Sequence, residues 1–314
     1  MFIVYLSVER LINEIKTDKP DPAAASALQE ALAGQFGEMR TMMQYQFQNF
    51  NFRGDVRPYR DLIKAVGNEE ISHVELVATT INKLLDGASN ADGDGSMAVE
   101  PNALPLANAL DGKGQIHHFL VAAQSARPVD AAGNPWTALY VYDSGNLVLN
   151  LLYNLMLECT GRLQKCRLYE MSKNKAFRST VSYLIVRDMA HEKVFAKALE
   201  SLGVDWGKTL PVPKVDTSKM PEVKELEARN LHNQQWTFAS DNSGLAKIFK
   251  GESPFGDGQL EALDGSPEGF EIPKFPDRQE EFASGLDEDL LSQAKAVSAG
   301  ELQAKDRKPQ TRSR

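Results

Sequence analysis

Two short motifs combine a carboxylate with an imidazole at a spacing that suits metal binding. Glu70 and His73 are three positions apart, and Asp188 and His191 repeat that spacing farther along the chain. Residues three apart share one face of a helix, so each pair points into a common space. Carboxylate and imidazole both bind transition metals. One Glu-x-x-His alone is weak evidence, because a solvated glutamate beside an ordinary histidine is the commoner explanation of a single motif.

Each motif interrupts the apolar face of a predicted helix, and two further helices carry a single acid in the same way. Glu38 lies on the inward stripe of one, and Glu158 lies among leucines of the other. A buried carboxylate without a partner costs on the order of several kcal/mol, so both acids require compensation. The four predicted helices span about 21–50, 58–86, 143–171 and 176–201.

The four helices form a concealed internal repeat. Glu38 is followed about 30 residues later by the Glu70 motif, and Glu158 is followed about 30 residues later by the Asp188 motif. Two helical hairpins are thus joined by a long crossover over residues 87–143. That connection, with one acid from two helices and an acid-x-x-His from the other two, is typical of ferritin-like carboxylate bundles. We therefore predict an all-α, ferritin-like four-helix bundle.

Five of these side chains are predicted to converge in the bundle interior. Five buried polar groups would be costly alone, but two divalent cations turn them into ligands and balance their charge. A carboxylate from the central motif can bridge two ions, while one acid and one imidazole complete each end. The predicted ligands are Glu38, Glu70, His73, Glu158 and His191.

Two more residues are predicted to act from behind the ligands. Asp188 is one methylene shorter than the glutamate of the symmetric pattern, so we expect it to orient a ligand rather than bind metal. Lys165 lies on the same helix face as Glu158 and is a candidate acid or base. The alternative for Lys165 is a salt bridge to a buried carboxylate, since buried charges usually pair.

Composition excludes several classes of function. Apolar content is 42% and charged content 25%, which is ordinary for a globular protein, and the net charge of −8 argues against nucleic-acid binding. Cys159 and Cys166 lie too far apart on one predicted helix to form a disulfide and are expected to be reduced. No apolar run is long enough to span a membrane, and the start lacks a signal peptide. We expect a cytoplasmic protein.

The chain changes character after the fourth helix. Repeated prolines and glycines indicate that residues 202–314 do not form a second core of comparable size. We predict two parts, a metal-binding bundle over residues 1–201 and a largely irregular extension over residues 202–314 that packs on a neighbouring subunit. The alternative is a tail that wraps its own surface or stays flexible.

Together these segments resemble the manganese catalases, the non-haem catalases with a dinuclear manganese site. The resemblance spans about residues 1–300 and is closer to members with a long C-terminal segment. The third helix resembles the members that place a lysine after its glutamate, matched by Lys165, rather than those with an arginine where this chain has Leu157. The matching segments are Leu32–Met39, Phe50–Gly54, Glu69–Leu76, Ser144–Leu147 and Val186–His191.

This resemblance implies the activity and the cofactor. The family's five ligands fall on the five residues predicted above, with Glu70 as the bridge between two manganese ions. The reaction implied is disproportionation of hydrogen peroxide to water and oxygen, with the metals cycling between Mn(II)2 and Mn(III)2. The resemblance also implies a homohexamer. Some members bind calcium at a subunit contact, but the residues around 240–244 align poorly, and calcium is not predicted here.

Other classes of protein share the bundle. A di-iron oxidase or peroxidase would normally carry Glu-x-x-His in both motifs, and Asp188 speaks against it. An iron-sequestering cage is usually shorter, and the long extension does not suit one. A bundle whose polar residues merely bond one another would bind no stoichiometric metal.

Overall fold

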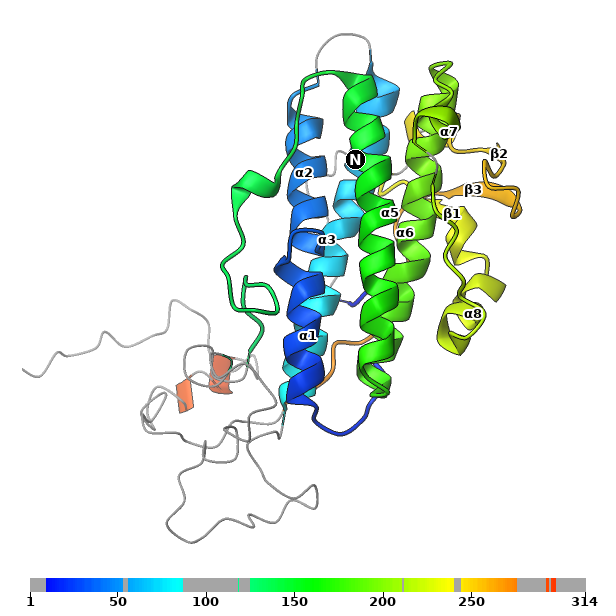
Figure 1. The fold of residues 1–314 in the computed structure, drawn as a ribbon. Helices are drawn as coiled ribbons and strands as arrows, with labels where there is room; N and C mark the ends of the chain where they lie inside the picture. Colours follow the sequence, from blue (N-terminus) through cyan, green and yellow to red (C-terminus); the bar gives the residue numbers. More distant parts are fainter. Residues whose placement is uncertain are drawn as a thin grey trace, which may run out of the picture.

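Five of the described helices form the body of the molecule, and the first two of them line up end to end (Figure 1). The structure is a computed structural model that describes residues 10–52, 56–86, 118, 125–210, 212–239, 244–275, 292–293 and 295–297. The helices are α1 (Pro22–Ala33), α2 (Glu38–Phe50), α3 (Arg57–Leu85), α5 (Leu147–Met171) and α6 (Lys175–Ser201). Prolines in the first turns of α1 and α3 mark the predicted helix starts.

The helix predicted over residues 21–50 is broken between α1 and α2, so the prediction of one continuous helix was wrong. Two glycines make the break compact. A Cβ at Gly34 would lie 2.4 Å from Glu30 Oε1, and a Cβ at Gly37 would lie 2.6 Å from the carbonyl oxygen of Ala31. Glu38 thereby becomes the first residue of α2, where the free N–H groups and the helix dipole favour a negative charge.

The helix predicted over residues 143–171 begins later than expected, at Leu147 of α5. Asn146 precedes the helix, and its side chain accepts a hydrogen bond from the N–H of Leu149. Asp143 instead accepts a hydrogen bond from Asn150, one turn into the helix. A side-chain cap of this kind stabilises a helix by about 1 kcal/mol.

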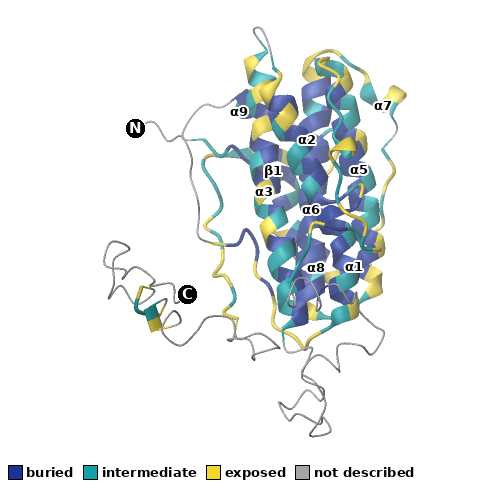
Figure 2. Cartoon of the chain, turned by 90° about the vertical axis from the view of Figure 1, so that its left-hand side faces the viewer, coloured by how far each residue is buried: buried dark blue, intermediate teal, exposed yellow. Residues whose placement is uncertain are grey.

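Two apolar clusters fill the bundle, and a polar layer separates them. On α3, apolar residues within 62–66 belong to one cluster and apolar residues within 76–85 belong to the other. Figure 2 shows that the residues on the inward faces of the helices are buried. Glu70 and His73 lie between these two stretches. The same order holds on α5 and α6, where buried polar residues again separate the clusters. The clusters therefore hold α3, α5 and α6 in register around the polar layer.

The described end of the crossover runs along α1 and α2. Gln29 Nε2 donates to the carbonyl oxygens of Arg127 and Val129, each at 2.7 Å, and η2 (Ala138–Tyr140) follows. Most of the predicted crossover lies outside the described residues. Cys159 and Cys166 are buried and free, as expected. Among the described helices, none is long and apolar enough to cross a membrane.

The extension contains more regular structure than predicted. Its elements are α7 (Trp206–Thr209), α8 (Pro221–Ala228), η3 (Leu231–Asn233), β1 (Gln234–Trp236), α9 (Gly244–Ile248), β2 (Gly251–Glu252) and β3 (Gln259–Leu263). The strands form one sheet in the order β1-β3-β2, with β1 parallel and β2 antiparallel to β3. This part of the extension packs on α6 of its own bundle (Figure 1). The inter-subunit arm stays a prediction.

A buried lysine of α6 anchors this part of the extension. Lys193 Nζ donates to the carbonyl oxygen of His232 at 2.9 Å, to Asn233 Oδ1 at 2.8 Å and to Asp257 Oδ2 at 2.8 Å. Burial raises the pKa of Asp257, but hydrogen bonds from Lys193 and Ser253 outweigh it and lower the pKa below the ordinary 3.8. The stability from this carboxylate is therefore present above pH 3.8 and is lost as the pH falls through the folded pKa.

This contact leads to a pH-dependent prediction. We expect Asp257→Asn to lower the free energy of unfolding at pH 7 by about 1 kcal/mol, because the substitution removes the charge from the hydrogen bond with Lys193. The effect is moderate because this carboxylate is partly exposed to solvent. The difference from wild type should shrink as the pH is lowered from 5 to 3. Chemical denaturation at each pH, with the exposed Asp264→Asn as control, measures it. A difference independent of pH would contradict the assignment.

Candidate metal centre

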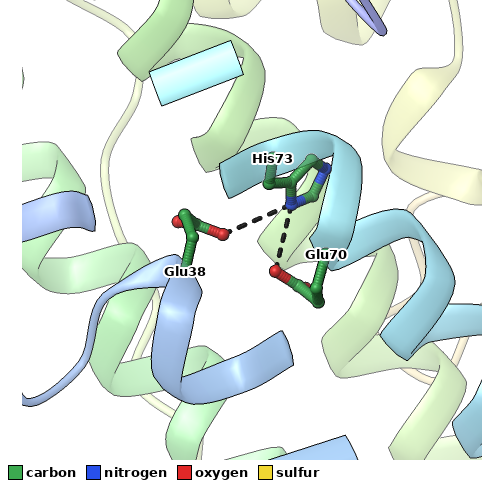
Figure 3. Close-up of side chains that lie close together, drawn as sticks. All are labelled: Glu38, Glu70 and His73. Atoms are coloured by element: carbon green, nitrogen blue, oxygen red, sulfur yellow. Dashed lines mark hydrogen bonds and ion pairs between the residues drawn. The ribbon is translucent and has the colours of Figure 1, made fainter. Parts of the chain in front are cut away.

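Side chains from α2 and α3 form one end of a buried cluster. Glu38 Oε2 lies 3.3 Å from His73 Nδ1, and Glu70 Oε2 lies 3.2 Å from the same nitrogen (Figure 3). All three side chains are almost completely buried, with exposed fractions of 1% or less. Glu38 reaches this space from the first turn of α2, which the helix break aims at the middle of α3.

Side chains from α5 and α6 form the other end, and Glu70 belongs to both. His191 Nδ1 lies 2.9 Å from Glu70 Oε1 and 3.7 Å from Glu158 Oε2. The two imidazole rings are stacked, with centroids 5.7 Å apart. In each of two groups, Glu38–Glu70–His73 and Glu70–Glu158–His191, the ligand-type atoms lie within 4.8 Å of one another. The structure therefore brings all five predicted ligands together in two groups that share one carboxylate.

The donor set suits metal cations. Three inward-facing atoms, Glu38 Oε2, Glu70 Oε1 and His191 Nδ1, have no hydrogen-bond partner of good geometry among the described residues. Buried polar atoms are normally satisfied, so these atoms require another partner. Three carboxylates and two imidazoles are ligand types that first-row divalent ions accept.

The carboxylates make this space strongly attractive to positive charge. Burial opposes a charged imidazolium, but neighbouring carboxylates, led by Glu70 for His73 and by Glu158 for His191, raise the pKa of both histidines well above 6.5. Burial likewise opposes the ionised form of Glu70, yet the two histidines lower its pKa well below 4.5. A metal ion would replace the histidine protons, because imidazole binds metal in its neutral form.

Comparison with known proteins decides the family. The sequence profile of the family described as manganese containing catalase matches residues 1–302. The chain belongs to the manganese catalase family. The predicted enzyme class, an oxidoreductase that acts on hydrogen peroxide, is thereby confirmed.

Curated relatives agree with this membership. A manganese catalase of Bacillus subtilis is 36% identical over 66% of this chain and 74% of its own. A manganese catalase of Lactiplantibacillus plantarum is 32% identical over 79% of this chain and 87% of its own. The uncharacterised protein YjqC of Bacillus subtilis is 36% identical over 82% and 88%.

Solved structures support the fold. The crystal structure of wild-type KatB, a manganese catalase from Anabaena, matches with a TM-score of 0.54 at 21% identity, over 76% of this chain and 94% of that one. The predicted all-α, ferritin-like architecture is confirmed by this likeness together with the family match.

Lys165 and Asp188 lie beside Glu38, at the end of the cluster that side chains of α2 and α3 form. Lys165 Nζ is 2.7 Å from Glu38 Oε1 and donates to both carboxylate oxygens of Asp188 at 2.7 Å. Burial would lower the pKa of Lys165, but Asp188 and Glu38 raise it well above its ordinary value. The lysine is therefore a cation at neutral pH, and the salt bridge that the sequence left as an alternative does form. Asp188 is occupied by this lysine and lies outside both ligand groups.

Glu69 is a member of the site that sequence reasoning missed. Its Oε1 lies 3.5 Å from His73 Nε2, and its Oε2 lies 3.5 Å from His191 Nε2. One buried carboxylate thus faces the outer nitrogen of both histidines, leaving Nδ1 of each directed at the ligand groups. Burial raises the pKa of Glu69, but Arg187 leads the groups that lower it well below 4.5. Its position beside Glu70 was the only signal in the sequence, and a helix surface residue would look the same.

Two hydroxyl groups of α2 complete the surroundings of the carboxylates. Thr41 Oγ1 donates to Glu70 Oε2 at 2.9 Å, and the Tyr45 hydroxyl donates to Glu158 Oε1. Sequence reasoning did not identify Tyr45 as part of the site. Burial and the charge of Glu158 raise its pKa well above 10, so the phenol remains a donor that orients this carboxylate.

Proposed function

We propose that the chain disproportionates hydrogen peroxide to water and oxygen at a dinuclear manganese centre in the polar layer of the bundle. One observation carries the proposal: two three-residue ligand groups share Glu70 and lie in the same buried space. A shared carboxylate between two acid–imidazole pairs suits a pair of ions better than a single one. The family match independently supports manganese and peroxide.

Each predicted ligand has a place in this proposal. Glu38 and His73 would hold one ion, Glu158 and His191 would hold the other, and Glu70 would bridge them. Carboxylates favour manganese, and neutral imidazole suits several transition metals.

The metal pair and the protein divide the work between them. When bound, manganese supplies the redox chemistry by cycling between Mn(II)2 and Mn(III)2. One peroxide takes up two electrons and two protons and becomes two waters. A second peroxide gives up two electrons and two protons and leaves as oxygen. The protein holds the ligands and excludes bulk water. Lys165 is proposed to donate a hydrogen bond to peroxide, or to give a proton to a peroxide oxygen that then leaves as water and to regain that proton from the second peroxide, with Asp188 fixing its ammonium group.

Assembly and location remain proposals that rest on the family resemblance. We propose a homohexamer and a cytoplasmic location on that ground; the exposed apolar side chains Phe50, Leu139 and Leu149 would suit burial between subunits.

Metal analysis and activity on one sample test the proposed function. We expect protein produced with manganese supplied to contain two manganese ions per subunit and to release oxygen rapidly from hydrogen peroxide, in a preparation shown to be free of haem. Two iron ions, or manganese without oxygen release, would favour a di-iron oxidase or peroxidase. Iron uptake far beyond two ions per subunit would favour storage.

A further inference from the structure

The extension reaches the metal centre through one buried side chain. Gln235, on β1, is completely buried, and its Nε2 donates to Glu69 Oε2 at 2.7 Å. Its Oε1 accepts a hydrogen bond of 2.8 Å from Arg187 Nη2. Both ends of this amide are therefore fixed, one on the carboxylate that faces the two histidines and one on the arginine that neutralises it.

Arg187 joins the same carboxylate to the backbone of the extension. Its guanidinium donates to both oxygens of Glu69 and to the carbonyl oxygens of Leu231 and Gln234. The Trp236 ring covers the group, with the guanidinium carbon 4.6 Å from the ring centroid. A planar group with five donors suits this arrangement, because it can hold a carboxylate and two carbonyl groups at once.

We propose that Gln235 is a positioning residue of the metal centre, and that docking of residues 231–237 and binding of manganese stabilise each other. The inference rests on the proposed dinuclear centre. Gln235 and Arg187 fix Glu69, and Glu69 faces Nε2 of His73 and His191. Glu69 lies 3.5 Å from each of these nitrogens without a hydrogen bond of good geometry, and a carboxylate beside a metal-binding imidazole favours the N–H form at Nε2, which leaves Nδ1 free for the metal.

The adjacent residue provides a matched control. Gln234 has the same side chain and lies on the same strand, but its Nε2 donates to Glu261 at 2.9 Å on the exposed side of the sheet. Methionine is unbranched and close to glutamine in length, so it retains most of the packing and removes both hydrogen bonds. Comparing Gln235→Met with Gln234→Met therefore separates the contact with Glu69 from the general stability of β1.

The first experiment measures how firmly manganese is held. Full-length wild type, Gln235→Met and Gln234→Met are loaded with manganese, the ions per subunit are counted, and release into an excess of chelator is followed. We expect release about 10-fold faster from Gln235→Met, the lower end of the effect of residues behind metal ligands. We also expect an altered electron paramagnetic resonance spectrum of its Mn(II) form, while Gln234→Met matches wild type. Equal release rates and identical spectra in all three proteins would overturn the inference.

The second experiment needs no substitution and covers the case in which Gln235→Met does not fold. Coupling between two binding events is reciprocal, so manganese should slow hydrogen exchange of wild-type amides in residues 231–237 several-fold, with α7 as the internal reference. No slowing there, despite protection of α3 and α6, would overturn this inference and leave the proposed function intact. A wild-type protein that binds no manganese would overturn both.

Discussion

Glu70→Gln should release oxygen at least about 100-fold more slowly than wild type while the bundle stays folded. Replacing a residue behind the metal ligands already costs up to about 100-fold in metal affinity or activity, and loss of a bridging ligand should cost more. Glu70 is the carboxylate common to both ligand groups. A neutral amide offers one oxygen and carries no charge, so it cannot join two cations in the same way. The glutamine oxygen can still accept from Thr41, as Glu70 does at 2.9 Å, which favours retention of the fold.

Oxygen release and manganese content, measured together, check this prediction. Glu75→Gln is the matched control, because Glu75 lies on the same helix and faces solvent; its activity should equal that of wild type. We expect Glu70→Gln to contain fewer than two manganese ions per subunit and to show an unchanged helical circular dichroism spectrum. Unchanged oxygen release would refute the bridging role.

The bundle and its ligand candidates could be predicted because they depend on local, periodic information. Apolar residues at helical spacing fix which face of each helix is buried. Any acid or imidazole on that face, such as Glu158 or His191, must then enter the interior. When the helices pack together, the polar residues on their buried faces form the observed polar layer between the two apolar clusters.

Residues around the ligands could not be predicted, because their roles depend on contacts between distant parts of the chain. Glu69 is buried only because Arg187, from another helix, and Gln235, from the extension, pair with it. The sequence does not encode that pairing in any periodicity. Likewise, β1 and β3 form a parallel pair across an intervening helix, and strands so short carry little pattern of their own. The break before Glu38 was missed because Gly34 and Gly37 interrupt a stripe that otherwise continues.

Lys165 is the residue whose replacement should separate catalysis from stability. The sequence left two roles for it, an acid or base and a buried ion pair. The structure places its ammonium group 2.7 Å from Glu38 and from Asp188.

We expect Lys165→Met to lower turnover about 100-fold, at the lower end for general acid–base groups. We also expect it to lower the free energy of unfolding by about 3 kcal/mol, because Asp188 is left buried without its partner. Lys165→Ala should lower turnover as well, with manganese content nearly intact.

A double substitution distinguishes the two effects. In Lys165→Met with Asp188→Asn, the unpaired carboxylate is replaced by a neutral amide of the same size, so most of the lost stability should return. Turnover should stay low, because no ammonium group remains beside Glu38 to donate to peroxide. Chemical denaturation, manganese content and oxygen release on the wild type, the single variant and the double variant measure this directly. If turnover returns together with stability, Lys165 is a structural partner of Asp188; loss of manganese from Lys165→Met alone would instead show that the lysine supports the ligands themselves.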